Sequence, residues 1–158
     1  MKKRGLAILI LVFAVILAML IPSLARMIRR SRISTCAGHL HTLWHVRAHQ
    51  YASSNDDRFP PNGGQYFLEL QRGREPRGKG LEMYFCPLTD EERIPGRTSY
   101  RGPALPLKKL SPEDPCAADR EENNGPGQGG NVLTMFGDVQ EVGSGDPRWL
   151  RARVTTKE

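Results

Sequence analysis

The amino-acid sequence predicts an α+β fold in which one long N-terminal helix packs on a small antiparallel sheet. The first observation is an uninterrupted apolar run, Leu6–Ile21, at the start of a chain that is polar elsewhere. The second is a helical spacing of apolar residues over residues 26–52. The third is a pair of short apolar segments near residues 131–142, with a Gly-Asp pair between them that is typical of a β-hairpin.

The apolar run is long enough to suggest a membrane anchor. A helix over Leu6–Ile21 would rise about 24 Å, and the hydrocarbon core of a bilayer is roughly 30 Å thick. Extension to Ala25 brings the helix to spanning length. We therefore predict a transmembrane helix over residues 6–25, preceded by a basic leader at residues 1–5.

Three interpretations of this N-terminus are open. A cleaved secretory signal would end after Ala25, where Ser23 and Ala25 resemble a small-residue cleavage site, but the arginines that begin at Arg26 oppose translocation. The second interpretation is a plain signal anchor. In the third, a basic peptide ending in Gly5 is removed and the helix beginning at Leu6 is retained. We favour a retained helix, and basic residues on both sides of it leave its orientation open.

Residues 26–52 are expected to continue the helix as an amphipathic segment. Apolar residues recur at steps of three and four, which places them on one face with Leu40, Leu43 and Trp44 at its centre. Pro22 would then lie inside a long helix and should kink it. The polar residues from Ser53 onward are expected to end the helix.

Residues 53–145 are expected to form a small, loop-rich β domain. The sequence predicts a helical turn or a short helix over residues 65–71 and a short strand or extended segment over residues 81–86. Further strands are expected near residues 98–100 and 117–118. A closing hairpin would pair residues 131–136 with 139–142 around a two-residue turn at Gly137–Asp138. The polar tail, residues 146–158, is expected to fray.

The three cysteines, Cys36, Cys86 and Cys116, form no C-x-x-C pair, which argues against zinc ribbons, thioredoxin-like centres and haem attachment. One disulfide is possible in an oxidising compartment. We prefer Cys36 with Cys86, because each lies beside apolar residues that should reach a shared core.

All four histidines fall within one stretch of the amphipathic helix. His41, His45 and His49 are spaced i, i+4 and i+8, so they would line one helical face and neighbouring pairs could share a metal ion. The alternative is that they lie on the solvent side of the helix, or on a surface that contacts a protein partner. No acidic or cysteine third ligand is close in the sequence.

Catalysis and nucleic-acid binding are not expected. The glycine-rich stretch Gly125–Gly130 lacks the Lys-Ser/Thr of a phosphate loop, and no G-x-S-x-G or H-E-x-x-H motif occurs. The net charge is +6, but the basic residues are scattered and form no compact stripe with stacking aromatic residues. We expect this charge to serve solubility and contact with anionic lipid near the anchor. We therefore expect that the chain is not an enzyme and needs no cofactor.

Four groups of residues resemble the type IV pilin and type II secretion pseudopilin superfamily, especially bacterial proteins with a prepilin-type cleavage/methylation leader and a short C-terminal sheet domain. They are Leu20–Arg26; Cys36–Leu43 with Tyr51 and Phe59–Pro61; Tyr84–Pro87 with Thr98–Tyr100; and Gly129–Leu133 with Phe136–Val139. They occur in the order of that family and span almost the whole chain.

The resemblance implies a pilin-like fold, cleavage between Gly5 and Leu6 by a prepilin peptidase, and packing of the N-terminal helix against other pilin-like subunits. It also implies a single-pass protein of the bacterial inner membrane with a periplasmic C-terminal domain. Ile10 stands where the family usually has the Glu that pairs with a neighbouring subunit, which favours a minor, capping or simply membrane-anchored relative.

Calcium is a further expectation, because major pseudopilins bind it in a comparable C-terminal loop. Asp119, Asn123, Asn124 and Asp138 could supply oxygen ligands if the loop before the hairpin folds back, although no EF-hand spacing is present. The rival hypothesis for the whole chain is a secreted or anchored extracytoplasmic binding module, dependent on a metal or on calcium and unrelated to pili.

Overall fold

The computed structural model describes residues 2–63, 65–72, 79–89, 91–125 and 127–157, with side chains from residue 8 onward except at residues 10 and 79. The chain divides into two compact units, Met1–Ser31 and Arg32–Glu158. The described part has the predicted α+β composition, with a long apolar N-terminal helix and a small antiparallel sheet.

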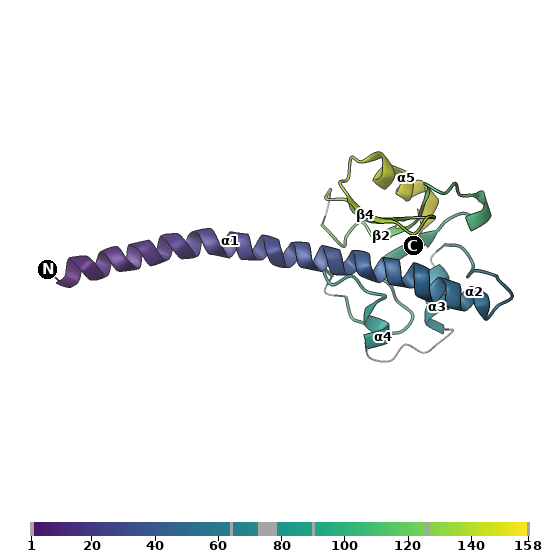
Figure 1. The fold of residues 1–158 in the computed structure, drawn as a ribbon, viewed down its shortest axis with the longest axis horizontal. Coiled ribbons are helices and arrows are strands. Elements are labelled where there is room, and N and C mark those ends of the chain that lie inside the picture. Colours follow the sequence, from purple (N-terminus) through teal and green to yellow (C-terminus); the bar gives the residue numbers. More distant parts are fainter. Residues whose placement is uncertain (1, 64, 73–78, 90, 126, 158) are drawn as a thin grey trace. The chain divides into compact units, whose positions relative to one another are not determined.

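Helical structure runs without interruption from residue 2 to residue 53. It consists of α1 (Lys2–Thr42), a π-helical turn η1 (Leu43–Ala48) and α2 (His49–Ser53) (Figure 1). The prediction of a helix to about residue 52 is therefore confirmed, and Pro22 lies inside α1. The π-helical turn was not predicted, because its i→i+5 bonding leaves no simple residue pattern.

The second unit buries the predicted apolar stripe of this helix. Cys36, Leu40 and Leu43 are 0 % exposed, and Trp44 is also buried. They pack in one core with aromatic residues from the rest of the unit, including Phe67, Tyr84, Phe85 and Tyr100. The spacing of three and four residues correctly identified the buried face.

The sheet has five antiparallel strands in the order β4-β3-β2-β1-β5. The strands are β1 (Tyr100–Pro103), β2 (Pro115–Asp119), β3 (Gly130–Thr134), β4 (Val139–Val142) and β5 (Thr156–Lys157). The strands predicted near residues 117–118, 131–136 and 139–142 are present, and the one predicted near residues 98–100 begins at Tyr100.

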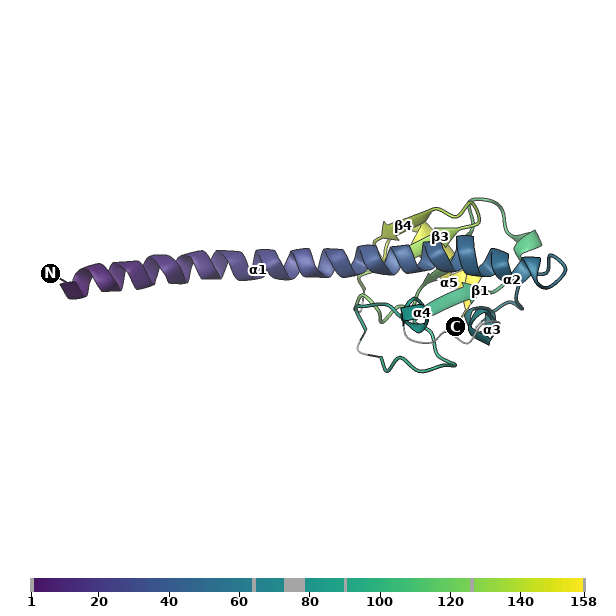
Figure 2. The same ribbon diagram turned by 60° about the horizontal axis from the view of Figure 1, so that its bottom comes forward.

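Helices cover both faces of this sheet. The helical residues from Arg32 onward lie on one face together with α3 (Gln65–Arg72), and α5 (Pro147–Thr155) lies on the other (Figures 1 and 2). On β3, Leu133 packs toward the first face and Val132 toward α5, as the alternation of a strand requires. Two short elements, α4 (Lys79–Glu82) and η2 (Leu107–Lys109), complete the second unit.

The strand predicted over residues 81–86 is wrong. Residues Lys79–Glu82 form α4, and the chain turns immediately after it through bonds from Tyr84 N to Leu81 O and from Phe85 N to Glu82 O. Phe85 and Cys86 are nevertheless buried. A short apolar run indicates burial but does not distinguish a strand from a buried turn.

The expectation that residues 146–158 fray is also wrong. Asp146 caps α5 by accepting a hydrogen bond from Arg148 N at 2.8 Å, and Pro147 occupies the first turn. Trp149 is 1 % exposed, and β5 pairs with β1. The expectation rested on the polar composition of the tail, whereas Asp-Pro is a sequence signal for the start of a helix.

The β3–β4 hairpin is present with a different turn from the one predicted. Leu133 pairs with Val139, and Gly137 N donates to Thr134 O at 2.9 Å. The turn therefore centres on Met135 and Phe136, and Gly137 adopts a φ of 91°. A type I turn followed by a left-handed glycine is a common hairpin solution.

Candidate functional site

The most conspicuous surface of the first unit is apolar. Its large apolar side chains that the structure describes between Ile8 and Ile28 are exposed, for example Leu9 at 67 % and Met19 at 71 %. The described helical run from Leu11 to Ser53 contains an 18-residue window with a mean hydropathy of 2.3, none of it buried. One N-terminal helix is thus long and apolar enough to span a membrane.

A buried polar centre in the second unit fixes the helix to the sheet. Asp119, at the end of β2, is fully buried. Its Oδ2 accepts hydrogen bonds from the backbone N of Asn131 at 2.8 Å, from Asn131 Nδ2 at 3.0 Å and from Asn124 Nδ2 at 3.1 Å. Its Oδ1 accepts from the Cys36 thiol at 3.1 Å. Burial raises the pKa of Asp119, and these donors oppose that rise.

Asn131 extends this centre to the helix backbone. Its Nδ2 also donates to Ile33 O at 3.3 Å, so one amide bridges β2, β3 and α1. Tyr100 lies beside the same centre, with its hydroxyl 3.5 Å from Cys36 Sγ. The centre is enclosed in the core, and its hydrogen bonds hold β2, β3 and α1 together.

The predicted cysteine pair is brought together. Cys36, Cys86 and Cys116 are all buried free thiols, and Cys36 and Cys86 lie in the same core, where burial and the neighbouring Cys86 raise the pKa of Cys36. Cys116 donates instead to Leu133 O at 3.6 Å. The disulfide between Cys36 and Cys86 stays a prediction, and the fold buries both residues in one core.

The structure does not gather the expected calcium ligands. Asp119 and Asn124 are in contact, whereas Asn123 donates from Nδ2 to Ser99 O at 2.7 Å. Asp138 is exposed and lies in the β3–β4 turn, at the opposite end of β3 from Asn131. Because a strand rises about 3.3 Å per residue, Asp138 lies roughly 10 Å or more from the Asp119 centre.

The three histidines of the predicted face separate into two groups. The His41 and His45 rings lie 4.2 Å apart, and His45 Nε2 is 3.3 Å from Gly137 O. His49 instead packs against Trp44 and Phe59, with ring centroids at 6.2 Å and 5.7 Å. The π-helical turn lies between His41 and His49, so the spacing assumed for a regular α-helix does not hold. Across the described residues, no three His, Cys, Asp or Glu side chains are grouped as a metal site would require.

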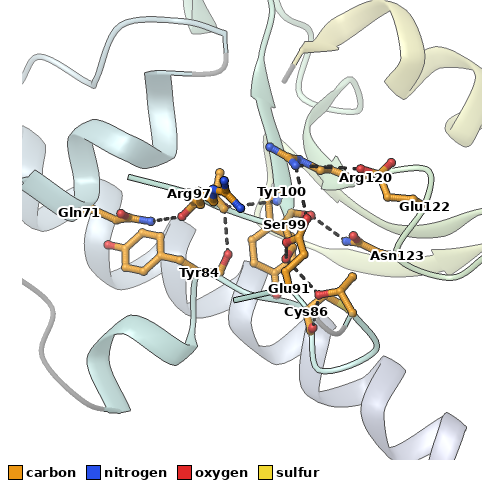
Figure 3. Close-up of polar contacts among 12 residues, drawn as sticks. Gln71, Tyr84, Cys86, Glu91, Arg97, Ser99, Tyr100, Arg120, Glu122 and Asn123 are labelled. Atoms are coloured by element: carbon orange, nitrogen blue, oxygen red, sulfur yellow. Dashed lines mark hydrogen bonds and ion pairs between the residues drawn. The ribbon is translucent and has the colours of Figure 1, made fainter. Parts of the chain in front are cut away.

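A polar network that the sequence did not predict holds the segment before β1. Ser99 is fully buried, and its hydroxyl donates to Glu91 Oε2 at 2.6 Å (Figure 3). Arg120 lies 3.5 Å from the other Glu91 oxygen, and its backbone N donates to Ser99 O at 3.2 Å. Ser99 N donates in turn to Tyr84 O at 3.0 Å. These contacts order a segment that has no regular secondary structure.

A pocket of about 460 Å³ opens beside η1 and α2. Its lining includes His45, His49, Gln50, Tyr51, Ser53 and Leu70. These side chains offer imidazole, amide and hydroxyl groups for hydrogen bonding.

Gly5 and Leu6, the predicted processing site, lie in the first turns of α1, and the side chains of Leu6 and Ile10 are outside the described part. Comparison with models of known protein families gave no match. Neither the curated proteins nor the solved structures include a match to this chain.

Proposed function

We propose that this chain is a membrane-anchored structural subunit of a pseudopilin-like assembly, of the type II secretion or type IV pilus kind. The N-terminal helix would be retained in the inner membrane and pack against other such helices. The second unit would face the extracytoplasmic side and select partners. Ile10, in place of a carboxylate, favours a minor or capping position over a main polymerising one.

One observation carries this proposal: the apolar side chains of α1 are exposed in its first part and buried in its last part. The large apolar side chains described between Ile8 and Ile28 are exposed, whereas Cys36 and Leu40 are completely buried in the second unit. A continuous apolar surface of that length is unfavourable in water and favourable in lipid. The helical residues from Arg32 onward, which are buried against the sheet, would belong to the extracytoplasmic domain.

Processing at Gly5 is the sharpest test. The full chain is expressed in bacterial membranes with and without a prepilin peptidase, and the intact mass of the purified protein is measured. The expected mature N-terminus is Leu6, and Gly5→Val should block the cleavage. Gly38→Ala is the matched glycine control, because an added Cβ there meets no atom within 4 Å. An N-terminus at Arg26, or an intact Met1 with active peptidase, contradicts the proposal.

Helix packing in the membrane provides a second test. A photo-crosslinking amino acid at Leu17, which is 40 % exposed, should give crosslinks to other pilin-like subunits when these are co-expressed. The same group at Val154 on α5, which is 68 % exposed, serves as the control for accessibility. Equal crosslinking at both positions would show non-specific collision.

A further inference from the structure

We propose that the pocket beside η1 and α2 binds a small organic carboxylate, in which Arg47 holds the carboxylate group while Tyr51 and Leu70 contact an apolar body. The pocket lies wholly within the second unit. Binding here does not depend on the membrane anchor or on assembly with other subunits. A volume of about 460 Å³ is within the range of small-molecule sites.

Arg47 brings a permanent positive charge to this pocket. Its side chain is half-buried on η1, and within the described part of the chain it forms no ion pair and no hydrogen bond. A guanidinium group stays protonated at any ordinary pH, and a partly buried charge is costly unless an anion compensates it. Arginine can present two parallel N–H donors to one carboxylate, so a ligand of this class satisfies both its charge and its donors.

The groups around Arg47 leave its charge uncompensated. The lining residues that the structure describes include no Asp or Glu. Glu69, which precedes the lining residue Leu70, is already paired with Arg72 at 2.6 Å. Tyr84 interacts electrostatically with Arg47, but burial raises the pKa of this phenol to about 12, so it is neutral at pH 7.

The remaining polar groups of the pocket favour a ligand with a single negative charge. The hydroxyls of Ser53 and Ser54 donate to backbone carbonyls of the preceding helical turn, at 2.9 Å and 3.0 Å, so their hydrogens are committed. Among the described lining residues, Arg47 is the only one with a permanent charge. One guanidinium neutralises a carboxylate, whereas a phosphate monoester carries a charge of about −1.5 to −2 at pH 7 and would be only partly neutralised.

Apolar groups line the same pocket. Leu70 comes from α3 and is 4 % exposed, and the half-buried ring of Tyr51 comes from α2. Both pack with the hydrophobic core, so their positions are fixed before a ligand arrives. Apolar walls with a few polar groups are typical of small-molecule sites. Arg47 also lies in a π-helical turn, a rare conformation that is frequent at functional sites.

The compound 3-phenylpropionate is a suitable probe, because it joins one carboxylate to an apolar ring. Its Kd should be on the order of 0.1–1 mM, as for other ligands of this size. The neutral amide 3-phenylpropionamide and the small acid propionate should each bind about tenfold more weakly or worse, since each lacks one of the two groups. Arg47→Gln should weaken binding of the probe by about tenfold to 100-fold, and Arg47→Lys, which keeps only the charge, by a smaller factor.

The test uses the full chain in detergent micelles. Isothermal titration calorimetry measures the affinity of each variant, and the Nε–Hε NMR signal of Arg47, assigned by its absence in Arg47→Gln, reports the place of binding. Arg26→Gln is the matched control, because Arg26 is an exposed arginine of the first unit. The wild type and Arg26→Gln should bind 3-phenylpropionate equally, with a saturable shift of the Arg47 signal.

Four results would overturn the proposal. Equal affinity for 3-phenylpropionate and its amide would mean apolar binding or partition into micelles, without a carboxylate site. Unchanged affinity in Arg47→Gln, or an equal loss in Arg26→Gln, would remove the role of Arg47. Inorganic phosphate that competes as strongly as the probe would mean a general anion site. Circular dichroism checks that each variant is folded, and if Arg47→Gln does not fold, Arg47→Lys and the comparison of ligands decide.

Discussion

The Cys36 thiol donates a hydrogen bond to Asp119 Oδ1 across 3.1 Å, and this contact joins the helix to the end of β2. Both residues are completely buried. The other oxygen of Asp119 collects three donors from Asn131 and Asn124. One carboxyl group thus organises contacts between α1, β2, β3 and the loop between these strands.

Replacing Asp119 should destabilise the second unit. Asp119→Ala removes the acceptor of the buried Asn131 N–H and one acceptor from each of the Asn131 and Asn124 side-chain amides, and we expect a loss of about 3 kcal/mol in the free energy of unfolding. Asp119→Asn keeps one oxygen for these donors, so its loss should be about 1 kcal/mol. Urea unfolding of the full chain in detergent, followed by Trp44 and Trp149 fluorescence, measures both.

The same pair of variants tests the charge state of Asp119. Burial raises its pKa above 3.8, so the folded chain binds this proton more tightly than the unfolded chain. Its contribution to stability is therefore complete below pH 3.8 and is lost as the pH rises through the folded pKa. Asp119→Asn should lack this dependence, and an unchanged pH profile in Asp119→Asn would contradict the assignment.

Oxidation should link Cys36 to Cys86. The two sulfurs are neighbours, and their bond would close a loop of about 50 residues, which stabilises the folded state by about 4 kcal/mol in the chain-entropy model. The measurement is thiol labelling under denaturing conditions after exposure to oxidant, combined with peptide mass mapping. One free thiol, Cys116, is expected, and a linkage that includes Cys116 would contradict the pairing.

The features predicted correctly are those that depend on residue spacing within one short segment. The helix over residues 26–52 was visible because Leu40, Leu43 and Trp44 repeat at helical spacing, and the hairpin because two apolar segments flank Gly137. The Asp119 centre could not be predicted in the same way. Its partner Cys36 is 83 positions away, and an Asp followed by Asn residues suggests a solvated loop until the fold buries it.

The sites predicted for metal ions show a second limit. The i, i+4, i+8 spacing of His41, His45 and His49 predicts one face only while the helix stays regular. The π-helical turn interrupts that regularity, and only tertiary packing decides where such a turn forms. At the C-terminus, by contrast, the Asp146–Pro147 pair is a local signal for a helix start, and polar composition alone is a poor guide to fraying.

Acid should weaken the attachment of α5. The hydrogen bond from Arg151 lowers the pKa of Asp114 from 3.8 to about 2, with Nε 2.9 Å from Oδ1. Since the folded-state pKa is depressed, this contribution is present above pH 3.8 and is lost as the pH falls toward 2. Thermal unfolding should be measured between pH 5 and pH 2. The melting temperature of Asp114→Asn should fall less steeply over this range than that of the wild type. A parallel decline would mean that Arg151 does not stabilise the folded state through Asp114.

Gly137 and His45 should be energetically coupled. Gly137 has a φ of 91°, and a Cβ there would meet the His45 ring, whose Nε2 is 3.3 Å from Gly137 O. Gly137→Ala should therefore cost about 1–2 kcal/mol for the left-handed backbone and about 1 kcal/mol more for displacing the ring. Gly96→Ala is the matched control, because Gly96 has a φ of 86° and an added Cβ there meets nothing within 4 Å.

A double-mutant cycle isolates the cost of displacing the His45 ring. His45→Ala alone should cost less than about 1 kcal/mol because the ring is exposed, and in its presence Gly137→Ala should cost no more than Gly96→Ala does in the wild type. Urea unfolding of the four variants of the cycle and of Gly96→Ala supplies the numbers. If Gly137→Ala costs the same with and without the imidazole, the ring does not restrain the hairpin. In that case the contact between η1 and the β3–β4 turn contributes no measurable stability.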